Sequence, residues 1–274
     1  MSSFSVGIVG LPNSGKSTLF NTLLKRQMAL VADYPFTTIE PNTGIVEVPD
    51  DDLIALVDLI NPEKVVPATV QFIDIAGLVK DAHKGEGLGN QFLGKIREVD
   101  AVVHLLRAFE NPQVAHYYET IDPKRDKEIV DIELELGGIK KPTLYVNNVS
   151  GEIAEGEVLS VNAKTGAGVD QLIQAAYRLL DLITFYTIKG GKEVTAWALR
   201  RGETALKASA LVHTDIAKGF IKAEVINVQD LLKIAPPAGG QGGWTAAKIA
   251  GKIRLEGKDY LLKDKDVIEF KFSL

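Results

Sequence analysis

The residues best suited to chemistry form a glycine-rich run near the start of the chain, Gly10 to Thr18, which reads GLPNSGKST. It matches the spacing G-x-x-x-x-G-K-[ST] and directly follows the apolar run 4–9. In such a run, backbone N–H groups and the start of the next helix surround phosphates, the lysine contacts the terminal phosphates, and the hydroxyl faces Mg²⁺. The pattern therefore predicts a phosphate-binding loop between a buried strand and a helix, with Lys16 and Ser17 as its chemical groups.

Two later stretches carry groups that complete such a site. Asp74 and Gly77 form a D-x-x-G box at the end of an apolar strand, where the carboxylate holds Mg²⁺ through water and the glycine N–H meets the γ-phosphate. Before it, the segment ADYPFTTIEPNTG is rich in turn residues and offers Thr38, or its neighbour Thr37, as a switch residue that completes Mg²⁺ coordination.

The position after Gly77 is Leu78, where Ras-like enzymes carry a glutamine that orients the attacking water. A leucine cannot orient water, so another group must do so if hydrolysis is to be fast. The glycine-rich segment 80–90 is suited to reorganise around a ligand, and it offers His83 as the catalytic candidate. Glu86 in the same segment is the alternative.

The base of the nucleotide is expected to meet a loop after the strand 142–148. GTPases end this strand in N-K-x-D, whose Asp accepts hydrogen bonds from guanine. Here the residues are Asn148, Val149, Ser150 and Gly151, and Glu152 lies one position late. A buried donor left unpaired costs about 1–3 kcal/mol, so a preference for guanine is not expected.

The elements that must position these groups alternate between strand and helix. Helices are predicted over 16–26, 88–99, 122–136 and 168–182, and strands include 101–106, 142–148 and 158–161. This alternation predicts an α/β fold with a doubly wound, mostly parallel sheet over residues 1–183. Asn162-Ala163-Lys164, after the last of these strands, is similar to a base-side loop.

From Thr184 onward, short strands follow one another around one helix over 205–212, which predicts a small α+β fold of ubiquitin-like type over 184–274. The expected strands are EVTAWALR, GFIKAEVI, KIRLEG, DYLLK and DVIEFKF. His213-Thr214-Asp215 is interpreted as a turn with Asp215 as a cap rather than as a catalytic dyad.

The composition excludes some kinds of chemistry and indicates where the protein works. The chain has no cysteine, which excludes disulfides and thiol chemistry, and it has no export signal or long apolar run, so we expect a cytoplasmic protein that does not contact membranes. The net charge of −5 is uneven, because residues 184–274 hold 15 Lys+Arg against 10 Asp+Glu. The C-terminal part is therefore the expected contact for nucleic acid, without DNA sequence specificity, although a mixed solvated surface is the competing interpretation.

Several stretches are specific enough to point to a family. GLPNSGKSTLFN, YPFTTIEPNTG, DIAGLVKDAHKGEGLGNQFL and VDAVVHLLRAFE closely resemble the Obg-like ATPases, the YchF type of P-loop GTPase relatives. The stretches HTDIAKGFIKAEVI and GKIRLEGKDYLLKDKDVIEFKF resemble the C-terminal TGS domain of that family.

This resemblance implies a hydrolase that prefers ATP to GTP, uses Mg²⁺, associates with ribosomes or ribosomal RNA through the TGS domain, and acts in translation or stress responses. It implies that His83 replaces the missing glutamine and that Asn13 marks a K⁺-dependent site. The nucleotide contacts that it implies are Asn13, Ser14, Gly15, Lys16, Ser17, Thr18, Gly77, Phe109, Asn148 and Val149, and the metal ligands are Ser17, Thr38 and Asp74.

The chain departs from the family pattern in two places. The family carries a long helical hairpin after the RAFE strand, whereas here a short stretch containing Gly137-Gly138 leads to Pro142, as a natural or engineered join would. Gly151 also stands where the family has Glu, which leaves the choice between ATP and GTP open. The alternative function is a non-enzymatic ribosome- or RNA-binding adaptor gated by nucleotide. A kinase is disfavoured because no acceptor pocket can be argued.

Overall fold

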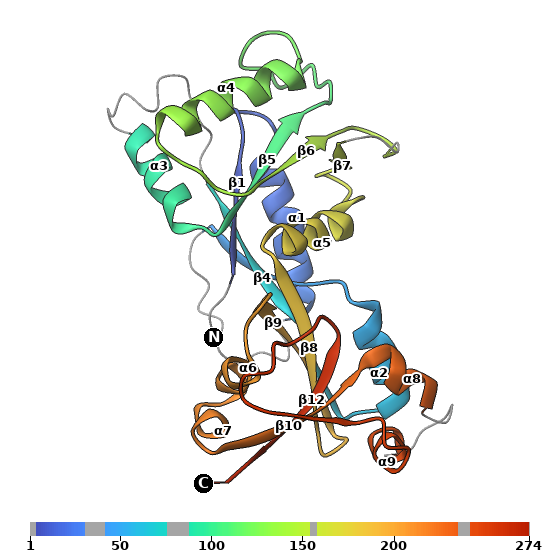
Figure 1. Ribbon diagram of the computed structural model, residues 1–274. Helices are drawn as coiled ribbons and strands as arrows, with labels where there is room; N and C mark the ends of the chain where they lie inside the picture. Colours follow the sequence, from blue (N-terminus) through green and yellow to red (C-terminus); the bar gives the residue numbers. More distant parts are fainter. Residues whose placement is uncertain (1–3, 31–41, 76–87, 154–157, 235–241, 274) are drawn as a thin grey trace. The chain divides into compact units, whose positions relative to one another are not determined.

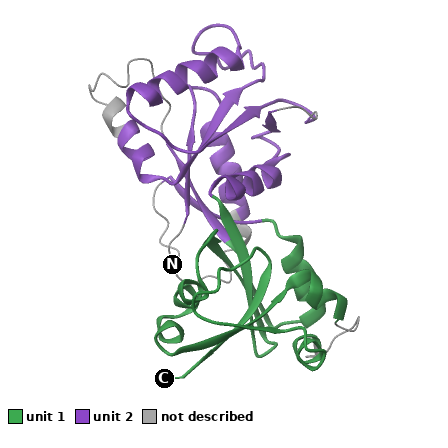
Figure 2. Cartoon of the chain, viewed as in Figure 1, with its two compact units in different colours: residues 1, 49–68, 181–274 green, residues 2–48, 69–180 purple. Residues whose placement is uncertain are grey.

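The structure is a computed structural model of the 274-residue chain and describes residues 4–30, 42–75, 88–153, 158–234 and 242–273. The chain divides into two compact units (Figure 2): residues 2–48 with 69–180, and residues 49–68 with 181–274. We call them the nucleotide unit and the C-terminal unit. Within the described residues, no helix combines the length and the apolar character needed to cross a bilayer.

The nucleotide unit is built on a six-stranded sheet in the order β2-β4-β1-β5-β6-β7 (Figure 1). Every neighbouring pair is parallel except β2 and β4, which are antiparallel. The carboxyl ends of the parallel strands therefore share one edge of the sheet, where ligands bind in folds of this kind. The strands are β1 (Ser5–Val9), β2 (Thr43–Glu47), β4 (Thr69–Asp74), β5 (Ala101–Arg107), β6 (Thr143–Asn148) and β7 (Leu159–Val161).

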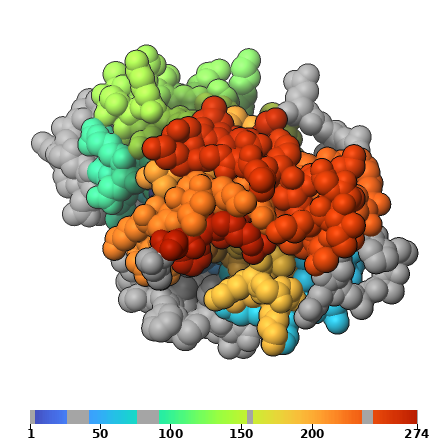
Figure 3. Space-filling view, turned by 60° about the horizontal axis from the view of Figure 1, so that its bottom comes forward, coloured from blue at the N-terminus to red at the C-terminus, as the bar shows by residue number. Residues whose placement is uncertain are grey.

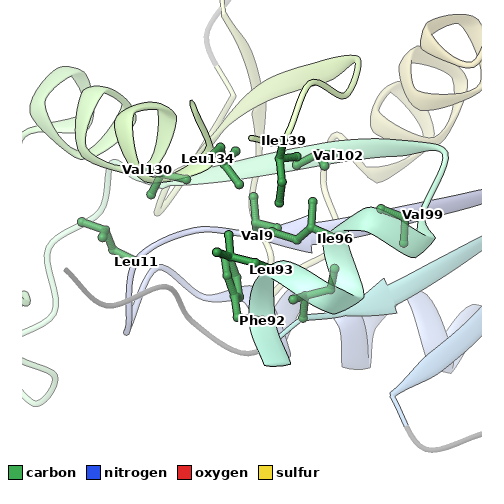
Figure 4. Close-up of a cluster of buried hydrophobic side chains, with 11 residues drawn as sticks. Val9, Leu11, Phe92, Leu93, Ile96, Val99, Val102, Val130, Leu134 and Ile139 are labelled. Atoms are coloured by element: carbon green, nitrogen blue, oxygen red, sulfur yellow. The ribbon is translucent and has the colours of Figure 1, made fainter. Parts of the chain in front are cut away.

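Helices cover both faces of this sheet, as the predicted doubly wound fold requires. Helices α3 (Leu88–Glu98) and α4 (Pro123–Leu136) lie on one side in Figure 1, and α1 (Lys16–Leu30) and α5 (Val169–Leu179) on the other. On the side with α3 and α4, a cluster of buried hydrophobic side chains forms the core (Figure 4), and Ile96, Val102 and Val130 in it are fully buried. Burying each such side chain contributes about 1.5–3 kcal/mol and holds the strand ends in place.

The C-terminal unit has its own six-stranded sheet, in the order β11-β10-β12-β8-β9-β3. β12 pairs with β8 and β3 with β9 in parallel, and the other pairs are antiparallel. Among the described residues, the helices of this unit are α2 (Asp51–Ile60), α6 (Ala205–Val212), α7 (Thr214–Lys218), α8 (Val228–Ile234) and α9 (Gly242–Ile249). The strands are β3 (Lys64–Val66), β8 (Leu182–Lys189), β9 (Glu193–Arg200), β10 (Phe220–Asn227), β11 (Arg254–Glu256) and β12 (Asp266–Phe272).

The structure corrects several predicted elements. The helix expected over 168–182 ends at Leu179, and residue 182 already begins β8, so the predicted division between 183 and 184 falls inside a strand. Residues 49–68, expected with the nucleotide domain, supply α2 and β3 to the C-terminal unit. The stretch DYLLK is no strand, since only Leu261 makes an isolated bridge, to Thr204.

The predicted role of Asp215 as a cap is also wrong. The cap of α7 is His213, whose Nδ1 accepts a hydrogen bond from the Asp215 backbone N–H at 3.1 Å. An imidazole nitrogen replaces the carboxylate here because His213 is the residue in extended conformation between α6 and α7.

Candidate nucleotide-binding site

The phosphate-binding loop lies between β1 and α1, as predicted. Gly10, Asn13 and Gly15 have positive φ angles of 153°, 63° and 96°. Glycine is needed at the two glycine positions, because an added Cβ would lie 2.5 Å from the Leu105 carbonyl oxygen at Gly10 and 2.2 Å from Asn148 Nδ2 at Gly15. The loop is therefore shaped by its glycines and by the two strands beside it.

Lys16 is buried inside this loop. Its Nζ donates hydrogen bonds to the carbonyl oxygens of Gly10, at 3.1 Å, and Leu11, at 2.8 Å. Burial lowers the pKa of Lys16 to about 8, and the nearby Asp74 carboxylate opposes this shift. A buried ammonium with mainly neutral partners is stabilised by an anion, so the loop is electrostatically matched to phosphate.

Ser17 and Asp74 meet beside the lysine. Ser17 Oγ donates to Asp74 Oδ2 at 2.9 Å, while Asp74 Oδ1 is buried and has no hydrogen-bond partner within the described residues. A hydroxyl and a carboxylate are the oxygen ligands that Mg²⁺ uses when phosphate oxygens and water supply the others. The residues present fit a Mg²⁺ site, although the described part of the chain holds no cluster of three His, Cys, Asp or Glu.

Lys16 and Ser17 open onto a cavity of about 600 Å³, a volume suited to a ligand the size of a nucleotide, and Asp74 is not among its lining residues. Of the predicted contacts, the cavity gathers Asn13, Gly15, Lys16, Ser17, Thr18, Phe109, Asn148 and Val149. Ser14 does not line it, because its side chain is buried behind the loop. The sequence-based prediction omitted Glu110, Asn111, Val114, Ser150, Gly151 and Asn162 to Thr165, which also line the cavity.

Some of these omissions had a sequence signal. Asn162 begins the stretch that is similar to a base-side loop, and its Oδ1 accepts the backbone N–H groups of Lys164 and Thr165, both at 3.1 Å. This Asx turn shapes that side of the cavity. Glu110, Asn111 and Val114 follow β5 in an irregular segment; Glu110 ends the family-like stretch VDAVVHLLRAFE, whereas no motif marks Asn111 and Val114.

Asn148, at the end of β6, joins two loops of the site. Its Nδ2 donates to the Ser14 carbonyl oxygen at 2.9 Å, and its Oδ1 accepts the Ala163 N–H at 3.1 Å. Both polar ends of this buried side chain are thus used within the protein. Asn148 therefore holds the phosphate loop against the base-side loop, in addition to lining the cavity.

Six residues singled out from the sequence lie outside the described residues: Thr37, Thr38, Gly77, Leu78, His83 and Glu86. Their roles stay predictions.

Family models match both parts of the chain. A family described as "50S ribosome-binding GTPase" matches residues 5–148, and the YchF GTPase C-terminal family, described as "Protein of unknown function (DUF933)", matches residues 182–273. The "Ribosome-binding ATPase YchF" of Haemophilus ducreyi is 39% identical over 370 aligned positions, covering 99% of this chain and 99% of the relative. The chain belongs to the YchF family. Its Bacillus subtilis member is 37% identical, with 98% of this chain and 99% of that relative covered.

Solved structures agree with this membership. The structure titled "Structure of the Schizosaccharomyces pombe YchF GTPase" matches with a TM-score of 0.79 and 25% identity, covering 98% of both chains. The alignment to the Haemophilus ducreyi YchF spans 370 positions, whereas this chain has 274 residues, so a long segment of that relative has no counterpart here. In the structure, α4 ends at Leu136 and only residues 137–142 lead to β6, which fits the missing hairpin.

Proposed function

We propose that this chain is a nucleoside-triphosphate hydrolase and molecular switch that associates with the ribosome. The observation that carries the proposal is the buried Lys16 ammonium, held in a glycine loop next to the Ser17–Asp74 pair. Its relatives are named ribosome-binding ATPases, which supports both parts of the proposal.

In this mechanism, Lys16 exchanges its two carbonyl partners for oxygens of the β- and γ-phosphates. Ser17 and Asp74 would hold Mg²⁺, and Thr38 is proposed as a further ligand. When bound, the metal neutralises charge that develops on the phosphates. His83 is proposed to orient the attacking water, because Leu78 has no group that can do so. The Gly77 N–H is proposed to meet the γ-phosphate and to sense its loss.

We propose that ATP is preferred to GTP. In support, Gly151 stands at the position of the N-K-x-D pattern where GTPases carry the Asp, so that position has no carboxylate to pair with guanine. Phe109 and Val149 line the same cavity and offer apolar contact to a base. Titrating both nucleotides into the full chain tests the preference, and equal dissociation constants would contradict it.

Ribosome contact is proposed for the TGS-like part, residues 184–274, because its excess of basic residues matches phosphate-rich RNA without requiring DNA sequence specificity. From the family resemblance, the chain is proposed to act in the cytoplasm, in translation or in stress responses. A K⁺ ion beside Asn13 is proposed as a further cofactor, by similarity to K⁺-dependent relatives.

Phosphate release with and without ribosomes tests the activity. His83→Ala should lower kcat by about ten- to a thousand-fold and leave ATP affinity within a few-fold, because the group that orients water is lost while the phosphate loop stays intact. Turnover equal to that of the unmodified chain would mean that Glu86 or K⁺, and not His83, orients the attacking water. ATP binding without turnover in the unmodified chain, ribosomes included, would favour the gated adaptor instead.

A further inference from the structure

One wall of the cavity is formed by the segment after β5, residues 109–116. Phe109, Glu110, Asn111 and Val114 of this segment line the cavity. The Phe109 ring lies beside the phosphate loop, with its Cε1 3.8 Å from the position of a Cβ on Gly15. The placement of this irregular segment therefore decides the shape of the site on its nucleoside side.

The buried side chain of Arg107 holds this segment through hydrogen bonds to its carbonyl oxygens. This side chain is 2% exposed, and its guanidinium donates only to carbonyl oxygens within the described residues: Phe109 (3.2 Å), Asn13 (3.4 Å), Val114 (2.8 Å) and Ala115 (3.3 Å). The guanidinium carbon also lies 4.7 Å from the centre of the Phe109 ring. The planar fork of Arg107 thus ties the wall to the phosphate loop and supports the aromatic ring.

His116, at the end of the segment, holds it to helix α4. Its Nδ1 accepts the Tyr118 N–H at 3.1 Å, so the ring proton is on Nε2, which donates to Asp126 Oδ2 at 2.7 Å. His116 is 8% and Asp126 2% exposed, and Arg125 donates to the other oxygen of Asp126 at 3.0 Å. Asp126 stands in the first turn of α4, which Val130 and Leu134 pack against the sheet. His116 therefore connects the wall to a rigid element.

We propose that His116 is a positioning residue for the nucleoside part of the ligand: through Asp126 and Tyr118 it sets the position of the wall that carries Phe109. This inference rests on the proposed nucleotide-binding function. The wall bonds the phosphate loop at Asn13, whereas Asn148 holds Ser14, so loss of His116 should leave the phosphate contacts of Lys16 and Ser17 in place.

The test compares ATP with inorganic tripolyphosphate, which carries no nucleoside, as ligands of the full chain with Mg²⁺. His116→Ala should raise the dissociation constant of ATP about ten-fold or more and change that of tripolyphosphate by less than about two-fold, since small misplacements of positioning groups are costly. His116→Gln should largely restore ATP affinity, because its amide can donate to Asp126 and accept from Tyr118. His213→Ala, which removes another histidine paired with an aspartate, serves as the control.

Equal weakening of both ligands, or no weakening of either, would overturn the proposal. Should His116→Ala fail to fold, hydrogen exchange of the unmodified chain decides: ATP should slow exchange at residues 109–118 more than tripolyphosphate does, and equal protection would refute the role of the wall. If the unmodified chain binds neither ligand, the proposed function itself fails, which is a result distinct from a loss confined to the variant.

Discussion

At the scale of single residues, Lys16 shows how burial prepares a group for its ligand. With a pKa of about 8, the nucleotide-free lysine loses much of its charge by pH 9, and bound phosphates favour the charged form. ATP binding at pH 9 should therefore take up a proton and weaken relative to pH 7, where the lysine is already charged. Calorimetry in buffers of different ionisation enthalpy measures the uptake.

The control is Lys16→Ala, which should abolish tight binding at both pH values because the loop loses its point charge. If ATP binds to the unmodified chain at pH 9 without proton uptake, the prediction is wrong, because Lys16 then does not gain a proton on binding.

Gly15 provides a second prediction at this scale. Gly15→Ala places a methyl group 2.2 Å from Asn148 Nδ2 at a φ of +96°, so the amide must move and its bond to Ser14 is lost. ATP affinity should fall about ten-fold or more, and stability by about 1–3 kcal/mol, as for a broken buried hydrogen bond in a strained loop.

Gly94→Ala is the matched substitution, since Gly94 lies in α3 with no atom within 4 Å of the added Cβ. It should keep full ATP affinity and gain about 0.5–1 kcal/mol from helix propensity. Equal effects of the two substitutions on ATP binding would show that the contact with Asn148 is unimportant.

At the scale of elements, the residue that caps the start of α2 also pairs with a buried side chain. Asp50 accepts the backbone N–H groups of Asp52 and Leu53 and also the hydroxyl of Tyr186, which is 1% exposed. Asp50→Ala removes a cap worth about 0.5–2 kcal/mol and leaves a buried hydroxyl unpaired at a further cost of about 1–3 kcal/mol. Urea unfolding followed by circular dichroism measures the loss.

Asp122→Ala is the comparison, because Asp122 caps α4 through Lys124 and Arg125 but is exposed. Only the cap is lost there, so about 0.5–2 kcal/mol is expected. A larger loss of stability for Asp122→Ala than for Asp50→Ala would contradict the proposed contribution of the hydrogen bond between Asp50 and the Tyr186 hydroxyl.

At the scale of the whole molecule, the basic excess lies in residues 184–274 of the C-terminal unit, whose later part forms the continuous orange-to-red surface in Figure 3. Two exposed lysines, Lys252 and Lys258, flank β11 on this unit. If the surface contacts ribosomal RNA, affinity for ribosomes should fall about ten-fold or more between 50 and 200 mM KCl, because binding releases counterions. Co-sedimentation of the full chain with ribosomes measures this.

Charge reversal locates the contact. Lys252→Glu with Lys258→Glu should weaken ribosome binding, whereas Lys95→Glu with Lys140→Glu, on exposed lysines of the nucleotide unit, should not. The opposite ranking would move the contact to the nucleotide unit. The full chain is needed because residues 184–274 alone lack α2 and β3, and Asp52 of α2 bonds both Lys265 and Gln229.

The sequence by itself determined the phosphate loop, the Asp74 box and the doubly wound sheet, since glycine spacing, apolar strands and helical periodicity are local signals. It also predicted that Asn148 belongs to the site, although only the structure shows that both ends of its amide bond other loops. Tertiary structure alone decided that residues 49–68 complete the C-terminal sheet and that Arg107 and His116 hold the wall of the cavity. These roles depend on partners far away in the chain or on carbonyl oxygens, which every residue carries and no sequence pattern marks.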